Sequence, residues 1–96
     1  MRFLLLLLIA VLSRAQSAPY VLLSWTESTP GVTGYYIYRS QTNGGPYNLA
    51  NPTPFKGTWC VDGKVSSGMT YYYVVKSVTA GGETSVYSNQ ITVVIP

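Results

Sequence analysis

Residues 68–75 read Gly68-Met69-Thr70-Tyr71-Tyr72-Tyr73-Val74-Val75 and open the longest apolar run after residue 18, Thr70 to Thr79. Aromatic and β-branched residues, which favour strands, dominate this run. Residues 80–83, Ala-Gly-Gly-Glu, then end it with a pair of glycines that accepts a tight turn. An apolar run of this composition, closed by a turn, predicts a β-strand.

Shorter runs of the same kind lie on both sides of it, and no segment after residue 18 has a helical period. The predicted strands are Tyr20 to Thr26, Gly34 to Ser40, Tyr47 to Ala50, Thr58 to Val61, Thr70 to Thr79 and Asn89 to Ile95. Turn residues separate them, such as Asn43-Gly44-Gly45-Pro46. Six short strands in about 80 residues favour an all-β sandwich of two sheets over a barrel.

The N-terminal segment has the parts of a secretory signal. Met1-Arg2 gives a positive start, Phe3 to Leu12 is unbroken apolar sequence, and Ser13 to Ala18 is rich in small residues. The apolar run is too short to span a bilayer, which needs about 20 residues. A buried N-terminal helix or strand is the alternative, but five consecutive leucines carry neither period. We therefore expect a signal peptide over residues 1–17, cleaved after Ala15 or Ser17, and one domain over residues 18–96.

Removal of this segment takes Arg2 and Arg14 with it and changes the charge. The remaining charged side chains nearly balance: Arg39, Lys56, Lys64 and Lys76 against Glu27, Asp62 and Glu83. No basic run is left to follow a phosphate backbone, so nucleic acid is not an expected partner. We expect a secreted protein, extracellular or periplasmic, with no membrane span after cleavage.

Catalytic chemistry has little support in the sequence. The chain has no histidine, which is the commonest general base and metal ligand. Its carboxylates, Glu27, Asp62 and Glu83, fall in separate turns and form neither a glycosidase pair nor a metal cage. Cys60 is the single cysteine, without an activating neighbour, and is predicted to be a buried structural thiol. No enzyme activity, cofactor or metal is expected.

Four segments resemble the fibronectin type III family in order and spacing. Leu22-Leu23-Ser24-Trp25-Thr26 resembles its second strand, and Gly34 to Arg39 resembles the third. Gly68 to Val75 resembles the Gly-x-Thr-Tyr-x-Tyr-x-Val segment that opens the sixth strand, and Ser85 to Asn89 resembles the start of the seventh. The resemblance covers residues 20–96 and implies an immunoglobulin-like sandwich. The sequence of these segments is similar to that of bacterial members of the family, which accompany secreted carbohydrate-active enzymes and surface proteins.

The resemblance also implies structural roles. Trp25 matches the family's core tryptophan, and Tyr71 matches the tyrosine corner, whose hydroxyl bonds to nearby backbone. Alternation from Tyr71 then sends Tyr73 inward, and the same alternation within Gly34 to Ser40 sends Tyr35 inward. Cys60 stands where relatives usually carry an aromatic core residue. The family's first strand is expected to be short or missing, because few residues separate the cleavage site from Tyr20.

A missing first strand would leave Tyr20 to Thr26 as an open sheet edge. Such an edge can pair with another chain, which predicts self-association or pairing with a neighbouring domain; the alternative is a monomer whose edge is frayed. The side chains that point outward from the larger sheet form a candidate binding face for an unknown protein or polysaccharide: Tyr36, Tyr38, Tyr72 and Val74. The alternative is that these aromatic residues only stabilise the sheet through cross-strand pairs.

The sequence thus predicts a secreted, non-catalytic fibronectin type III module that acts in protein or carbohydrate-surface interaction or as a spacer. The alternative is a structural fragment of a larger secreted protein, such as a carbohydrate-active enzyme or adhesin. The chain stops at Ile95-Pro96, where a linker to a further domain would be expected.

Overall fold

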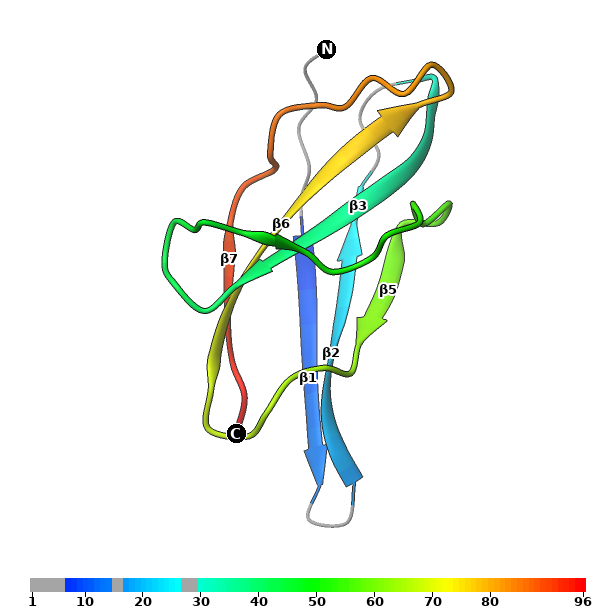
Figure 1. Cartoon of the computed structure of the whole chain (residues 1–96). Coiled ribbons are helices and arrows are strands. Elements are labelled where there is room, and N and C mark those ends of the chain that lie inside the picture. Colours follow the sequence, from blue (N-terminus) through cyan, green and yellow to red (C-terminus); the bar gives the residue numbers. More distant parts are fainter. Residues whose placement is uncertain (1–6, 15–16, 27–29) are drawn as a thin grey trace.

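The computed structural model describes residues 7–14, 17–26 and 30–96, and all of the regular structure in these ranges is β-strand. The strands follow one another along the chain as shown in Figure 1. Their bounds are β1 Leu7–Arg14, β2 Ser17–Trp25, β3 Val32–Ser40, β4 Asn48–Leu49, β5 Trp59–Asp62, β6 Thr70–Thr79 and β7 Ile91–Val94.

The strands form two antiparallel sheets. One has the order β1-β2-β5 and the other the order β4-β3-β6-β7. In Figure 1, β3 and β6 run obliquely to β1 and β2, as strands of a second layer. This arrangement confirms the predicted two-sheet sandwich of the immunoglobulin-like class.

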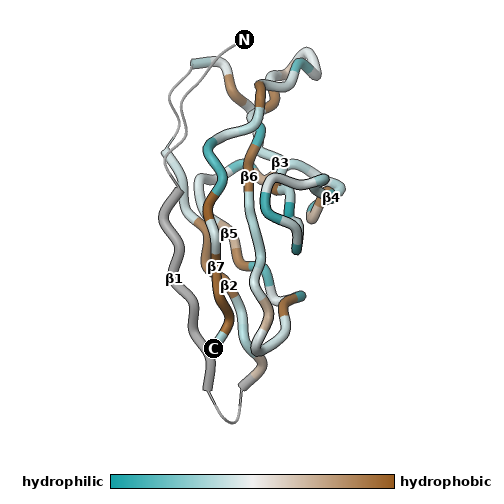
Figure 2. Tube along the Cα trace, turned by 90° about the vertical axis from the view of Figure 1, so that its left-hand side faces the viewer, coloured by the Kyte–Doolittle hydropathy of each residue, from teal (hydrophilic) through white to brown (hydrophobic). Residues whose placement is uncertain are grey.

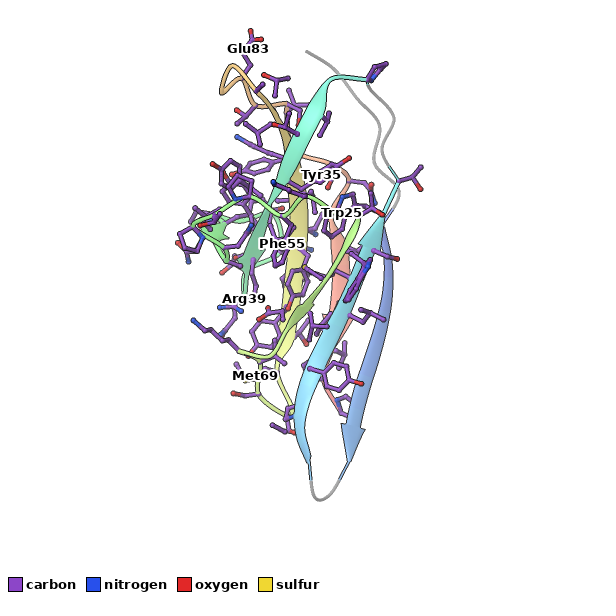
Figure 3. The ribbon with its side chains drawn as sticks, turned by 90° about the vertical axis from the view of Figure 1, so that its right-hand side faces the viewer. Trp25, Tyr35, Arg39, Phe55, Met69 and Glu83 are labelled. Atoms are coloured by element: carbon purple, nitrogen blue, oxygen red, sulfur yellow. The ribbon has the colours of Figure 1, made fainter. Side chains whose placement is uncertain are left out.

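The core lies between the two sheets and is built by alternation along the strands. β2 contributes Val21, Leu23 and Trp25, while β3 contributes Tyr35 and Ile37. Figure 2 shows hydrophobic segments along the middle of the molecule, with paler or hydrophilic colours at most turns. Trp25 and Tyr35 meet across the interface in Figure 3, and their ring centroids lie 5.3 Å apart at 64°. Such an edge-to-face pair adds about 0.5–1.5 kcal/mol beyond area burial.

The predicted strands lie close to the observed ones. β6 has the predicted bounds, and its inward positions Tyr71, Tyr73 and Val75 belong to the core. β3 begins two residues earlier than expected, at Val32. β4 has only the pair Asn48–Leu49, because the chain then leaves β3 toward Pro52 and Pro54.

The first strand requires a correction. It was expected to be short or missing, yet β1 pairs with β2 from the Leu7–Trp25 pair to the Arg14–Ser17 pair. The residues of β1 are apolar and favour strands, and they lie next to an edge of β2 that would otherwise be open. Pairing gives hydrogen-bond partners to the backbone N–H and C=O groups of both strands. The residues of β1 fall inside the predicted signal peptide. In the whole chain the edge of β2 is therefore covered, and removal of the signal by cleavage remains a prediction.

The outer edge of β3 is covered partly by a side chain. The amide oxygen of Asn51 accepts a 2.7 Å hydrogen bond from the backbone N–H of Ile37. Its amide nitrogen donates to the carbonyl oxygens of Tyr35, at 3.2 Å, and Thr53, at 2.8 Å. Phe55 then exchanges two backbone hydrogen bonds with Tyr35. Residues 48–55 thus pair the edge of β3 although β4 itself is short.

Candidate interaction surface

The outer face of the larger sheet is defined by the register of β3 and β6. Tyr36 lies opposite Lys76 and Tyr38 lies opposite Val74, so these side chains share the face turned away from the core. Two further aromatic residues reach this face from irregular segments: Tyr47 precedes β4, and Tyr87 lies between β6 and β7. The face therefore combines strand residues with residues from two loops.

Three tyrosines and one lysine make contact there, and we call them the tyrosine cluster: Tyr38, Tyr47, Tyr87 and Lys76. The ring centroid of Tyr87 lies 5.2 Å from that of Tyr38 and 5.2 Å from that of Tyr47, and both pairs are edge-to-face. The ammonium of Lys76 lies 4.4 Å from the Tyr87 ring centroid and 5.6 Å from that of Tyr38. A cation over an exposed ring contributes about 0.5–1 kcal/mol. The cluster is thus an ordered unit centred on Tyr87.

Burial raises the pKa of Tyr38, and the neighbouring phenols of Tyr87 and Tyr36 raise it further. The phenol therefore stays protonated at neutral pH and keeps a hydroxyl that can donate a hydrogen bond. The positive charge of the cluster comes from Lys76. The face consequently offers aromatic surface, hydroxyl groups and one cation.

Gln90, just before β7, fixes the loop that carries Tyr47. Its side-chain oxygen accepts hydrogen bonds from the Tyr47 hydroxyl and, at 2.9 Å, from the backbone N–H of Gly44. Its amide nitrogen donates to the side-chain oxygen of Asn43 at 2.8 Å. Gly44 has a φ of +85°, which a glycine adopts without strain. Gln90 thereby holds the turn over residues 43–44 against the segment that leads into β7.

The structure places the residues of the predicted binding face differently from one another. Tyr36, Tyr38 and Tyr72 lie on the outer face and are half-buried. Val74 is only 2% exposed although it is outside the core between the sheets, so it offers no surface to a partner. Among the described residues, no ring contact joins Tyr72 to the tyrosine cluster.

Sequence reasoning missed Tyr47, Tyr87, Lys76 and Gln90. Tyr87 is 41% exposed and lies in a segment without strand pairing, where alternation gives no face. The one available signal was Lys76, which the alternation of β6 sends outward beside Tyr36. The contacts of Tyr47 and Tyr87 depend on how two loops fold over the sheet.

A second group of polar residues joins the two sheets at the end of β5. The Asp62 carboxylate accepts 2.7 Å hydrogen bonds from the Arg39 guanidinium of β3 and from the Tyr73 hydroxyl of β6. Its other oxygen accepts a 3.0 Å bond from the backbone N–H of Lys64. We call Arg39, Asp62 and Tyr73 the inter-sheet clamp. From the sequence, Asp62 is expected only as a turn residue.

The clamp sets the protonation of its members. Burial alone would raise the pKa of Asp62, but the hydrogen bonds from Tyr73, Arg39 and the Lys64 backbone outweigh it and lower the pKa. Burial, followed by the hydrogen bond to Asp62, raises the pKa of Tyr73. Asp62 is therefore a charged acceptor and Tyr73 a neutral donor at neutral pH. An acid held in this way is poorly suited to proton transfer.

Comparison with known proteins was made at the levels of sequence and structure. No family model matches the sequence, and no curated protein matches it. Solved structures do match. A fibronectin type III-like protein from Clostridium thermocellum superposes with a TM-score of 0.75 at 28% identity, covering 92% of this chain and 88% of that chain. A human fibronectin type III domain superposes with a TM-score of 0.68 at 17% identity, covering 91% and 72%.

The chain has the fibronectin type III fold. A similar unit occurs within larger proteins. Pectate lyase PelI from Erwinia chrysanthemi, in complex with tetragalacturonic acid, matches with a TM-score of 0.73 at 22% identity. That match covers 94% of this chain but 28% of the lyase.

Residues characteristic of the fibronectin type III fold occupy the core of this chain. Trp25, Tyr35 and Tyr73 are buried. The hydroxyl of Tyr71 accepts a 3.0 Å hydrogen bond from the backbone N–H of Ser66, five residues upstream. This is the geometry of a tyrosine corner, which fixes the crossing between the two sheets.

Cys60 is the departure from the fibronectin type III pattern. Its thiol is buried, and burial raises its pKa to about 12, with a smaller effect from the charge of Asp62. The residue lines a cavity of about 90 Å³ between β3 and β5, together with Ile37, Ala50, Asn51, Phe55, Val61 and Asp62. The pocket is open to solvent on one side, since Phe55 and Val61 in its lining are exposed.

Other functional groups were sought in the described part of the fibronectin type III sandwich. Over residues 7–14, 17–26 and 30–96, no three potential metal ligands gather in one place. Within the same ranges there is no helix with the length and hydropathy needed to cross a membrane.

Proposed function

We propose that the chain is an exported, non-catalytic fibronectin type III module that binds a protein partner through the tyrosine cluster on the outer face of its larger sheet. The observation that carries the proposal is the contact of Tyr87 with Tyr38, Tyr47 and Lys76. Tyrosine is enriched at protein interfaces, where it combines a large contact area with a hydroxyl group.

A protein partner fits this geometry better than a polysaccharide. Sugar rings stack on flat, accessible aromatic faces. Here the Lys76 ammonium lies over the rings of Tyr87 and Tyr38, and neighbouring rings meet at 66° to 80°. No coplanar platform is left among these three rings. The surface here mixes apolar and charged groups: Tyr87, which is 41% exposed, its neighbour Val86, which is 60% exposed, and the ammonium of Lys76. Such a surface suits a protein contact instead.

The absence of catalysis belongs to the proposal and has two supports. The chain contains no histidine. The acid Asp62 is engaged in the inter-sheet clamp, and the single thiol of the chain has a pKa raised to about 12 by burial. Neither group is prepared for nucleophilic or acid–base chemistry at neutral pH.

A second candidate function is that of a structural spacer within a larger protein. The match to 28% of pectate lyase PelI favours it, since a unit of this fold occurs there beside other sequence. A spacer requires no conserved contact at the tyrosine cluster. Binding measurements on variants of this face therefore separate the two functions.

The test uses the purified exported chain against a panel of extracellular proteins and a glycan array. Tyr87→Ala removes the centre of the cluster, while Trp59→Ala removes a side chain that is 63% exposed on the other sheet and serves as the matched control. We expect a protein ligand whose affinity falls about 30-fold in Tyr87→Ala, as for an interface residue that contributes about 2 kcal/mol, and is unchanged in Trp59→Ala. Equal losses in both variants, or binding to glycans alone, would contradict the proposal.

Export is tested separately by N-terminal sequencing of the protein recovered outside the cell. We expect the sequence to begin at Gln16 or Ala18. A recovered chain that still begins at Met1 would show that residues 1–17 are retained.

A further inference from the structure

The place of β1 in the smaller sheet carries a further inference. β1 pairs antiparallel with β2 from Leu7 opposite Trp25 to Leu12 opposite Tyr20, with an irregularity before Arg14. It also lies beside β7 of the other sheet. β1 therefore covers the side of the sandwich between β2 and β7.

The same residues form the apolar part of the predicted signal peptide. Cleavage after Ala15 or Ser17 would remove the whole of Leu7–Arg14 and leave β2 at the new N-terminus. The inference rests on this part of the proposed function. It involves a different sheet from the tyrosine cluster, so the two can fail independently.

Loss of β1 would expose an edge whose only protective feature is a proline near its start. β2 has no charged residue from Ser17 to Trp25, and Pro19 lies near its start. Charges, prolines and bulges are the features that keep natural sheet edges from pairing. Its inward residues Val21 and Leu23 are fully buried in the chain with β1 present. The edge left behind would thus combine unpaired backbone groups with adjacent core.

We propose that this edge is an acceptor site for a strand supplied by another polypeptide, which takes the position of β1. The structure gives the form of the occupant: an extended, apolar segment of about eight residues that runs antiparallel to β2 and carries a charge only at its C-terminal end, as β1 does at Arg14. Backbone hydrogen bonds supply affinity in this mode, and pockets for alternate side chains supply selectivity.

A second copy of β2 fits the site less well than a free segment. β2 of a second copy is already paired with its own β5 and has its own larger sheet behind it. Edge-to-edge pairing of two β2 strands would extend the sheet without placing a strand beside β7. A free segment can do both, as β1 does.

The experiment keeps the full chain and cuts it after folding. A recognition site for a specific protease is inserted between Ala15 and Gln16, the folded protein is cut, and a fluorescent peptide of residues 7–14 is added. The control peptide carries Ile9→Pro and Val11→Pro, which retain apolar character but remove two backbone donors. Fluorescence anisotropy reports peptide uptake, size-exclusion chromatography reports dimers, and circular dichroism reports the fold.

We expect the native peptide to exchange into the cut protein and the proline peptide to bind about tenfold more weakly or worse. If the cut protein unfolds when the segment leaves, refolding on addition of the native peptide alone supports the site as well. A cut protein that stays folded without taking up the peptide, or that forms a dimer instead, overturns the proposal. Equal uptake of both peptides also overturns it, because binding would then not use strand pairing.

Discussion

The hydroxyl of Tyr73 on β6 donates a 2.7 Å hydrogen bond to the carboxylate of Asp62 on β5, so two side chains join the two sheets directly. Arg39 adds a 2.7 Å ion pair to the same oxygen from β3. The clamp lies at the edge of a core that is otherwise almost entirely apolar. Its stability contribution and its response to pH can both be measured.

Removal of the carboxylate should destabilise the domain. Asp62→Ala leaves the Tyr73 hydroxyl and the partly buried Arg39 guanidinium without their acceptor. We expect the free energy of unfolding to fall by about 2–3 kcal/mol, since hydrogen bonds to charged groups contribute about 1.5–3 kcal/mol. Urea denaturation provides the measurement. Glu83→Ala, at an exposed turn, is the control and should change stability by less than about 0.5 kcal/mol. Similar losses in both variants would rule out a stabilising clamp.

The clamp also predicts how stability depends on pH. The folded state lowers the pKa of Asp62, so the unfolded chain binds more protons than the folded one in acid. The stabilisation is therefore complete above about pH 4, the range of a free aspartate, and is lost as the pH falls through the lower folded pKa. Unfolding free energies measured from pH 7 to pH 2 should fall less steeply in Asp62→Asn than in the native chain. Parallel curves would mean that Asp62 does not contribute to acid sensitivity.

The tyrosine corner can be tested by removing one oxygen atom. Tyr71→Phe deletes the acceptor of the Ser66 N–H, and we expect a loss of about 0.5–1.5 kcal/mol with the fold retained. Tyr72→Phe on the neighbouring, half-buried position provides the comparison. A denaturation midpoint that moves no more in Tyr71→Phe than in Tyr72→Phe would show that the corner adds nothing to stability.

The thiol of Cys60 should react slowly in the folded protein. The thiolate is the reactive form, and burial that raises the pKa to about 12 makes it scarce at pH 8. We expect labelling by a disulfide reagent to be on the order of a thousandfold slower in native buffer than in denaturant, where the pKa is about 8.5. Equal rates in the two conditions would show that the thiol is accessible.

The cavity beside Cys60 gives an opposite pair of variants. Cys60→Leu places more apolar volume next to about 90 Å³ of unfilled space, and we expect stability to rise by about 0.5–2 kcal/mol. Cys60→Ala enlarges the cavity and should lower stability. Thermal unfolding compares the two with the native chain. A loss in Cys60→Leu would mean that the site is already full and that the larger side chain is strained.

The sequence predicts those features that depend on local periodicity. β6 occupies the predicted Thr70 to Thr79, and alternation places Tyr35 and Tyr73 on the inner face, as the structure has them. Period-2 patterning works here because each sheet buries one face and register is then fixed by the core. The two-sheet architecture follows from the same pattern together with the turn residues.

Features formed by segments far apart in the chain could not be derived in this way. Alternation correctly sends Val74 outward, but it cannot show that the residue is buried on that side. The clamp joins Arg39 and Asp62, which are 23 residues apart, through a contact that no short motif encodes. The segment of β1 also has the features of a signal peptide, because an apolar run followed by small residues satisfies both descriptions, and its cleavage remains a prediction.

The side chain of Asn51 has a consequence for the behaviour of the chain at high concentration. By occupying the hydrogen-bonding groups of Tyr35 and Ile37, it closes that flank of the larger sheet with an amide that cannot be extended by a further strand. Growth of the sheet into a fibre is therefore blocked on this flank. Solubility of the exported protein should then depend on the edge of β2, which cleavage would open. Asn51→Leu would open a second edge, on β3, from which ordered aggregates can start.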